Sequence, residues 1–466
     1  MLNHVRKILL INPDSRPIYE GSVVEDISPS YPPLNLALIA AVLLQNKYNV
    51  KVLDLNIEND QNAFDKILKD YAPDMVGITF KTPHFDTVKN YLKRIKDFND
   101  TIITVIGGIH ATSMPKECLD EMDCDICVVG EGENTIIELL NNELSDVSNI
   151  AFKNNKSEII INQRSMNVSS MDELPIPAWQ LFDLSKYNSP SVVSKRSPVG
   201  FIESSRGCMF GCSYCNKNVF GQSFRVKSIG RFLDEMKYMK KIGFNELYVV
   251  DDGFTTDVIR AKEICKRIIE EQLDIVWTLT NGIRVDKVDE ELFPLLRKAG
   301  CYQVAFGIES GNQVVLNKFG KGTKIEQVPK AVKLARKAGI DTIGYFIIGL
   351  PDDTEETIKE TISFSKKIDL DLAKFNILIP YPGTRLFRSW DSKNLIISKE
   401  WQHYNRYKPS QIFNHPNLSW DTIYSYQEKA FRSFYFRPSF VVRRILKGIK
   451  NNTIFDDLKV FVKTEW

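Results

Sequence analysis

The sequence predicts an α/β protein, with a doubly wound parallel sheet in the N-terminal third and a partial barrel of six β/α units in the middle third. Two observations predict this class. Short apolar runs, long enough for strands, alternate with longer stretches whose apolar residues recur at helical spacing. The chain has 466 residues, of which 43% are hydrophobic and 26% are charged. That balance is typical of a folded protein of about three domains, and it excludes a disordered or collagen-like chain.

The charge balance argues against a general attraction to nucleic acid. Lys and Arg number 61 and Asp and Glu number 59, which gives a formal net charge of +2. The apolar run at residues 8–11 is too short for a signal peptide or a membrane span, and no stretch approaches twenty apolar residues. We therefore expect a cytoplasmic protein whose eight cysteines stay reduced and serve as ligands or buried thiols.

Five strands are expected in the N-terminal third, with helices between them. The predicted strands are residues 7–12, 50–54, 75–79, 102–106 and 126–129, and the predicted helices are residues 34–46, 63–71, 86–98 and 134–142. Ligands of such sheets bind where the strands end. The turn at residues 107–112 begins with two glycines, which would let a bulky ligand approach the backbone, although a tight turn without a ligand would look the same. Neither a GxGxxG nor a Walker motif is present.

The middle third resumes the alternation after a Pro-rich connector that contains a predicted hairpin at residues 150–152 and 159–162. The predicted strands are residues 200–205, 246–250, 275–280, 303–308, 342–348 and 374–379, and the predicted helices are residues 232–242, 259–271, 290–299, 326–338 and 354–368. Six units fall short of the eight of a full barrel. Chemistry in such barrels sits at the carboxyl ends of the strands.

The first barrel strand runs directly into three closely spaced cysteines. Cys208, Cys212 and Cys215 are separated by three and then two residues. A loop this short can present three thiolates to three irons of a 4Fe–4S cluster, and it leaves the fourth iron open for catalysis. A structural zinc site would need a fourth Cys or His in the same loop, and the nearest histidines are His110 and His403. Three unrelated buried cysteines are the other alternative.

This CxxxCxxC motif at the end of the first strand of a partial barrel resembles the radical S-adenosylmethionine (SAM) enzymes, and the resemblance covers residues 200–383. It implies that the open iron binds SAM and that an electron cleaves SAM to a 5′-deoxyadenosyl radical. It also implies further SAM-binding positions: Tyr214 near the adenine, Asp251 and Asp252 near the methionyl amine, Glu309 and Ser310 at the ribose, and Gly349 in the motif beside the adenine. Glu309 or Asp252 could instead be capping or salt-bridging carboxylates.

The N-terminal sheet, placed before such a barrel, resembles the flavodoxin-like (Rossmann) domain of the cobalamin-dependent branch of this family. The turns at residues 32–34, 107–112 and 130–133 are similar to its recurring turns. The cobalamin-binding positions that the resemblance implies are Gly107, Gly108, His110, Thr112, Gly130 and Glu131. The DxHxxG motif is absent, as is common in this branch, and the loop at residues 12–17 contains no histidine. We therefore predict base-off cobalamin with no histidine on cobalt.

The resemblance divides the chain into a cobalamin-binding domain (1–145), a connector (146–199), a partial (β/α)6 radical SAM barrel (200–383) and a small, mostly helical C-terminal segment (384–466). It implies an enzyme that methylates an unactivated carbon through a 5′-deoxyadenosyl radical and methylcobalamin. Flavodoxin or ferredoxin would be the external one-electron reductant. A cobalamin-dependent cyclase or rearrangement enzyme without methyl transfer is the main alternative. An RNA methylthiotransferase and a non-enzymatic cobalamin sensor are less favoured.

Two features bear on partners. Cys118, Cys124 and Cys127 could hold the second cluster of a methylthiotransferase, but buried thiols explain them better, and no basic RNA-binding module is evident. Residues 432–450 are basic and amphipathic, which would suit contact with anionic lipid or a hydrophobic substrate; a helix docked on the barrel is the favoured alternative. We expect a small-molecule or lipid-like substrate and no nucleic acid.

Overall fold

The N-terminal domain is built on one seven-stranded sheet. The computed structural model describes residues 2, 4–22, 25, 29–165, 170–190 and 193–451. The strands are β1 (Lys7–Asn12), β2 (Asn49–Asp54), β3 (Met75–Thr79), β4 (Ile103–Gly107), β5 (Ile126–Val128), β6 (Ile150–Lys153) and β7 (Ile159–Ile161). Their order is β2-β1-β3-β4-β5-β6-β7, and the first five are parallel. This order has its switch point between β1 and β3, as in flavodoxin-like sheets, and it confirms the predicted doubly wound fold.

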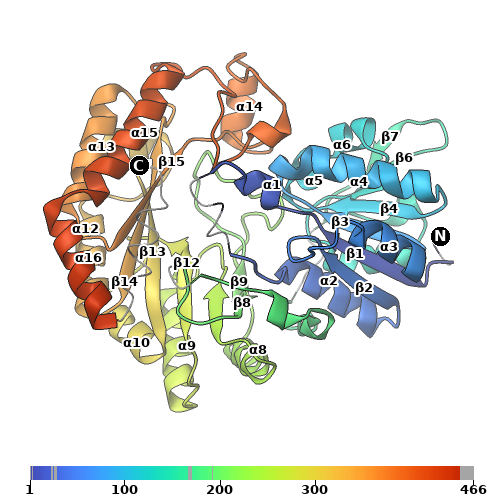
Figure 1. Ribbon diagram of the computed structural model, residues 1–466, viewed down its shortest axis with the longest axis horizontal. Helices are drawn as coiled ribbons and strands as arrows, with labels where there is room; N and C mark the ends of the chain where they lie inside the picture. Colours follow the sequence, from blue (N-terminus) through green and yellow to red (C-terminus); the bar gives the residue numbers. More distant parts are fainter. Residues whose placement is uncertain are drawn as a thin grey trace.

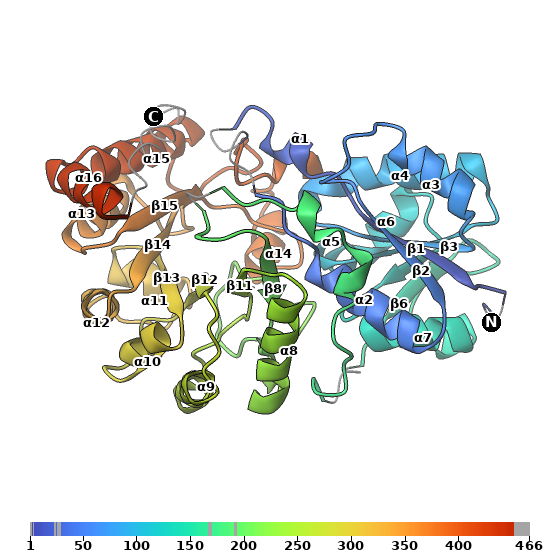
Figure 2. The same ribbon diagram turned by 60° about the horizontal axis from the view of Figure 1, so that its bottom comes forward.

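Helices cover both faces of this sheet (Figure 2). They are α1 (Arg16–Tyr19), α2 (Leu34–Gln45), α3 (Ala63–Tyr71), α4 (Phe85–Phe98), α5 (Ile109–Ser113), α6 (Pro115–Glu121) and α7 (Glu133–Asn141). Apolar side chains at helical spacing turn toward the strands, as Val88, Leu92 and Ile95 of α4 do. The predicted hairpin is present, but it does not belong to a connector. Strand β6 pairs antiparallel with β5, because its buried residues 150–152 cover the open edge of β5, and β7 pairs antiparallel with β6. The sheet therefore extends past residue 145 to residue 161.

The middle third forms a six-stranded parallel sheet that curves into a partial barrel (Figure 1). Its strands are β8 (Val199–Ile202), β11 (Glu246–Val249), β12 (Trp277–Ile283), β13 (Cys301–Glu309), β14 (Asp341–Ile348) and β15 (Leu372–Ile377). Each strand pairs with its neighbour in the sequence. The intervening helices are α8 (Ile229–Lys241), α9 (Val258–Glu270), α10 (Leu292–Lys298), α11 (Gln313–Lys318), α12 (Gln327–Lys337) and α13 (Glu355–Lys367). The predicted partial barrel is therefore confirmed.

The C-terminal segment packs against both domains. Its described helices are α14 (Arg385–Asp391), α15 (Trp420–Tyr435) and α16 (Pro438–Asn451). Helix α15 covers β15 from outside, where Phe431 and Phe434 contact Phe375. Before α15, Trp401 reaches the N-terminal domain and donates from Nε1 to Glu117 Oε1 at 2.6 Å. This segment thus joins the open side of the barrel to the first sheet.

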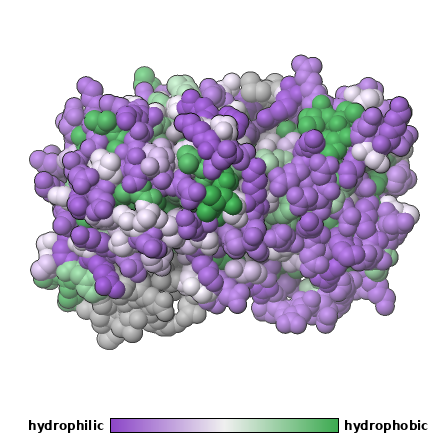
Figure 3. Space-filling model, turned by 90° about the horizontal axis from the view of Figure 1, so that it is seen from above, coloured by the Kyte–Doolittle hydropathy of each residue, from purple (hydrophilic) through white to green (hydrophobic). Residues whose placement is uncertain are grey.

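Helix α16 is docked on the barrel, as the favoured interpretation of the basic stretch predicts. Lys447 forms ion pairs with Asp341 and Asp371, and Arg443 pairs with Asp369. Val442 and Leu446 are exposed on the same helix. Contact of this side with lipid stays a prediction, as does the cytoplasmic location. No helix among the described residues is long and apolar enough to cross a bilayer, and the face in Figure 3 is mostly hydrophilic, with separate apolar patches.

Candidate cluster and cofactor site

The three predicted cluster ligands lie on one loop, which a short two-stranded ribbon closes. Strands β9 (Ser205–Arg206) and β10 (Arg225–Val226) pair antiparallel at its base. Gly207 has φ +83°, and a Cβ there would lie 2.2 Å from the carbonyl oxygen of Ser223, so the loop can start in this way only with glycine. We call residues 207–224 the cluster loop. All three cysteines in it are free thiols.

The thiols of the cluster loop fit an iron–sulfur cluster better than a single ion. Loss of hydration and the nearby thiols of Cys212 and Cys208 raise the pKa of Cys215 to about 11, so the three sulfurs lie within electrostatic range of one another. No three His, Cys, Asp or Glu side chains among the described residues are close enough together to hold one metal ion. A 4Fe–4S cubane is larger than an ion, so its three thiolates stand further apart, each on a different iron.

Two cations lie beside these thiols. Burial raises the pKa of Cys212, and the positive charges of Lys321 and Arg284 act against that rise. The Arg284 guanidinium also stacks on Phe210 of the cluster loop, 3.6 Å from its ring centre, and donates to the carbonyl oxygen of Lys321 at 2.8 Å. Neither cation is predicted from the sequence, because neither belongs to a motif and each is distant in the sequence from the cysteines.

Hydrogen bonds tie the cluster loop to the N-terminal domain and to the end of the barrel. Asn216 Nδ2 donates to Ser113 Oγ in the N-terminal domain at 2.8 Å and to the carbonyl oxygen of Pro382 at 2.9 Å. Within the loop, Lys217 Nζ donates to the carbonyl oxygen of Cys208 at 2.8 Å. Because two of these partners come from distant elements, contacts between parts of the molecule help to fix the conformation of the loop.

Two of the predicted SAM-binding residues meet directly beside the cluster loop. Tyr214 stacks on Phe319 with ring centres 4.7 Å apart, and its hydroxyl donates to Glu309 Oε1 at 3.0 Å. Lys321 Nζ donates to the same oxygen at 2.8 Å, and both charged side chains are nearly buried. Glu309 has φ +65°, an unfavourable backbone conformation for a residue with a side chain. The strained backbone at Glu309 and the buried ion pair are features typical of a functional site.

The two predicted aspartates have different positions. Asp251 is buried, and its carboxylate accepts hydrogen bonds at 2.6 Å from the Ser204 backbone and from the hydroxyls of Ser204 and Ser205. It therefore links the ends of β8 and β11. Asp252 is exposed and accepts a bond from the Gly207 backbone at 2.9 Å, at the start of the cluster loop. Of the two, Asp252 is the one available to a ligand.

The other two predicted positions on this side, Ser310 and Gly349, shape the turns after β13 and β14. Ser310 is buried against Thr361, with 3.2 Å between their hydroxyl oxygens. Gly349 has φ +82°, and its backbone N–H donates to Asp353 at 3.1 Å. The Ser310 side chain is therefore turned into the protein, and both residues present their backbone at these turns.

The glycine turn at the end of β4 is as tightly built as its sequence predicts. Gly107 ends the strand, and Gly108 has φ +97°. A Cβ at Gly108 would lie 2.7 Å from the carbonyl oxygen of Phe80, so this turn requires glycine. Thr112 is buried, and its hydroxyl accepts a bond from the Gly130 backbone at 3.0 Å. Thr112 thereby holds the turns after β4 and β5 together.

His110 lies behind this turn instead of facing a ligand. It is 0% exposed, its ring packs edge-on against Phe85 and Trp401, and Nδ1 lies 3.1 Å from the hydroxyl of Thr82. Burial lowers the pKa of His110 to about 3, so the ring is neutral near pH 7. The sequence indicated a cobalamin contact, but Trp401, which comes from the C-terminal segment, covers the ring.

A buried ion network joins the two domains next to the first cluster ligand. Arg206, two residues before Cys208, is 2% exposed and bonds Glu131, Glu133 and Glu203, each at 2.7 Å. Arg225 adds a bond of 2.9 Å to Glu131. Burial disfavours the charge of Arg206, but Glu203 and Glu133 raise its pKa well above the usual value. Glu131, expected at the cofactor, thus connects the turn after β5 to the base of the cluster loop.

Comparisons with known proteins agree with this architecture. The radical SAM superfamily model matches residues 202–365, and the B12 binding domain model matches residues 22–140. A Pyrococcus horikoshii protein named as the uncharacterized methyltransferase PH0819 is 35% identical over 466 aligned residues, covering 96% of this chain and 98% of its own. The chain belongs to the cobalamin-dependent radical SAM enzymes.

Another relative and a solved structure of this kind are similar over most of their length. The cytidylyl-2-hydroxyethylphosphonate methyltransferase of Streptomyces wedmorensis is 30% identical, with 89% of this chain and 87% of that protein covered. The structure of the radical SAM methyltransferase TsrM from Kitasatospora setae, with cobalamin and a [4Fe-4S] cluster bound, has a TM-score of 0.72 at 18% identity and covers 91% of each chain. As a cobalamin-dependent radical SAM enzyme, this chain takes three cofactors: a 4Fe–4S cluster, SAM and cobalamin.

Proposed function

We propose that this enzyme transfers a methyl group from SAM to an unactivated carbon of a small-molecule substrate. The observation that carries the proposal is the contact of the cluster loop and its base with the ligand-binding edge of the N-terminal sheet. Asn216 of the loop bonds Ser113, and Arg206 at the base of the loop bonds Glu131 and Glu133. A reaction that needs a radical and a methyl donor at the same carbon requires SAM and cobalamin to lie beside the same substrate-binding space. Methyl transfer is also the activity in the names of the two relatives above.

The chain's own residues would bind and orient the cofactors. When bound, the cluster and SAM supply a radical that removes a hydrogen atom, and cobalamin supplies the methyl group. We assign Cys208, Cys212 and Cys215 to the cluster, and Tyr214, Asp252 and Glu309 to SAM. We assign Gly107, Gly108 and Gly130 to cobalamin, because they lie at the carboxyl ends of β4 and β5, where ligands of such sheets bind. An external flavodoxin or ferredoxin would supply the electron.

A substrate-free experiment separates methyl transfer from the cyclase or rearrangement alternative. The reconstituted holoenzyme is reduced with dithionite and given SAM under anaerobic conditions. A methylase forms about one S-adenosylhomocysteine per bound cobalamin, because the first SAM gives its methyl group to the cofactor. An enzyme that only rearranges its substrate forms 5′-deoxyadenosine without S-adenosylhomocysteine, and this result would contradict the proposal.

Glu309→Gln is expected to keep the cluster and to weaken SAM binding by about 1–3 kcal/mol, since a charge-assisted bond to the ribose hydroxyls is lost. Equilibrium binding of SAM to the cluster-loaded protein measures the effect. Glu291→Gln, at an exposed site paired only with Lys262, is the matched control and should leave the affinity unchanged. Equal SAM affinities of the Glu309 variant and the wild type would mean that Glu309 does not bind SAM and serves only in the ion pair with Lys321.

The cob(II)alamin form is expected to show no nitrogen splitting from a protein imidazole in its electron paramagnetic resonance spectrum. His110 is buried behind its turn, and Nε2 of His84 lies 2.9 Å from the Ser15 hydroxyl. Burial lowers the pKa of His84 to about 4, so both rings stay neutral and enclosed near pH 7. Imidazole splitting that disappears in His84→Ala or His110→Ala would show that a histidine reaches cobalt.

A further inference from the structure

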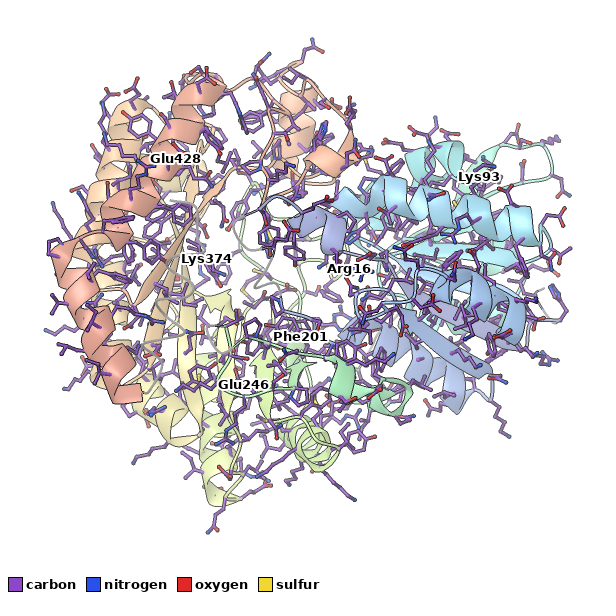
Figure 4. All side chains as sticks on the ribbon, in the orientation of Figure 1. Arg16, Lys93, Phe201, Glu246, Lys374 and Glu428 are labelled. Atoms are coloured by element: carbon purple, nitrogen blue, oxygen red, sulfur yellow. The ribbon has the colours of Figure 1, made fainter. Side chains whose placement is uncertain are left out.

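Lysine 374 lies on the inner face of the barrel wall, away from the helices. On β15, Ala373 and Phe375 are buried outward beneath α15, whereas Lys374 between them is exposed on the opposite side. Figure 4 shows its position facing the central space between the barrel and the N-terminal domain. Its register partner on β14 is Tyr345, and the Lys374 ammonium lies 5.7 Å from the Tyr345 ring centre.

Two more cations share this space. Lys81 follows β3 in the N-terminal domain, and Arg406 lies in the C-terminal segment; both side chains are exposed to solvent. Even so, loss of hydration lowers the pKa of Lys81 and of Lys374, and the positive charge of Arg406 lowers both further. Arg406 therefore lies within electrostatic range of both lysines, in a space where neighbouring atoms displace part of their hydration. The three cations reach it from three separate parts of the chain.

Within the described part of the chain, none of these cations has a carboxylate partner. Among residues 2–451 that the structure describes, no Asp or Glu forms an ion pair with Lys81, Lys374 or Arg406, whereas Arg206 has three carboxylates. The bond of Arg406 is to the hydroxyl of Tyr407, at 2.5 Å. Like charges that repel one another in a poorly hydrated space destabilise the empty site, and an anion that enters removes that cost.

Aromatic rings complete the wall, and the wall reaches the cofactor site. Tyr19 and Tyr407 pack with ring centres 4.7 Å apart. The Tyr345 hydroxyl donates to the carbonyl oxygen of Thr280 at 2.7 Å, which fixes its ring beside Lys374. Burial raises the pKa of Tyr345 to about 12, and the charge of Glu309 adds to the rise. The Tyr345 ring is therefore within electrostatic range of Glu309, the residue proposed to bind SAM.

We propose that the substrate is an anion with an aromatic or other flat ring, and that Lys374 and Arg406 bind its phosphate, phosphonate or carboxylate group. The inference rests on the proposed methyl transfer, whose substrate it describes by class. With the anionic group at these cations, the ring lies along Tyr345 and points its carbon toward Glu309 and the cluster loop. Lys81, on the opposite wall, adds positive charge from the cobalamin side.

Phenyl phosphate tests the inference, with phenol as its neutral counterpart, by isothermal titration calorimetry on the holoenzyme with SAM present. We expect phenyl phosphate to bind at least tenfold more tightly than phenol, and Lys374→Met/Arg406→Met to remove that preference. Lys393→Met, an exposed lysine of the same segment, is the control and should keep it. Lys374→Arg/Arg406→Lys retains the charges and should retain most of the preference.

Three outcomes would overturn the inference: equal binding of the two probes by the wild type, an unchanged preference in the double Met variant, or loss of cobalamin from that variant. The last would mean that the cations bind the phosphate of the cofactor. Cluster and cobalamin content of each variant are therefore measured first. S-adenosylhomocysteine formation by the same wild-type preparation tests methyl transfer separately: if it forms while phenyl phosphate shows no preference, only the substrate class is wrong.

Discussion

Replacing Cys208, Cys212 and Cys215 with alanine is expected to abolish cluster assembly and, with it, all reductive cleavage of SAM. Each substitution removes one of only three protein ligands, and no other cysteine lies in the cluster loop. The loss should be complete for iron content, for the visible absorbance of the cluster and for 5′-deoxyadenosine formation. Cobalamin binding should persist, because the first sheet does not depend on these thiols.

Cys265→Ala and Cys301→Ala are the matched controls. Both thiols are 0% exposed, one in α9 and one at the start of β13, and burial raises the pKa of both, so neither is a ready iron ligand. These variants should keep full cluster content, at a small cost in stability from the lost sulfur. An intact cluster in the triple alanine variant would mean that the cluster loop is not the cluster site.

Replacing Arg206 with methionine is expected to destabilise the protein by about 3–5 kcal/mol, because it leaves Glu131, Glu133 and Glu203 together without their shared partner. The free energy of unfolding from urea denaturation measures the loss. Cluster content should fall as well, since Arg206 fixes the strand that enters the cluster loop.

The control for this variant is Arg267→Met, which removes a pair with Glu271 on the surface of α9. Exposed pairs of this kind contribute about 0–1 kcal/mol. A second variant, Arg206→Lys, keeps one charge but cannot reach three carboxylates at once, so it should fall between the two. If Arg206→Met costs no more than Arg267→Met, the network does not join the domains energetically.

The sequence predicts the long elements well, because their burial follows a period that recurs over many residues. Short helices such as α1, α5, α6 and α11 were not predicted, since four to seven residues span at most two turns and show no clear period. The pairing of β6 with β5 was also missed. A hairpin's own turn is local, but which sheet edge it covers is decided by tertiary packing.

The same distinction applies to the site. The spacing of Cys208, Cys212 and Cys215 is local and could be read directly, as could the glycine turn at residues 107–108. The ion pairs of Lys321 with Glu309 and of Arg206 with Glu131 could not be predicted, because nothing in the sequence indicates that two distant charges are partners. His110 shows a second limit: its turn predicts a ligand contact, but nothing in the sequence indicates that its ring packs against Trp401, 291 positions later (401 − 110).

The network around Arg206 also bears on the order in which the holoenzyme is built. During synthesis the N-terminal domain folds first. At that stage Glu131 and Glu133, in the turn after β5, are close together, and the arginine that pairs with both of them has not yet been made. Their mutual repulsion is relieved only when Arg206 and Arg225 emerge and dock, which also closes the ribbon beneath the cysteines. The loop predicted to receive iron and sulfide is thus shaped by domain docking, and we expect cluster insertion to follow that docking.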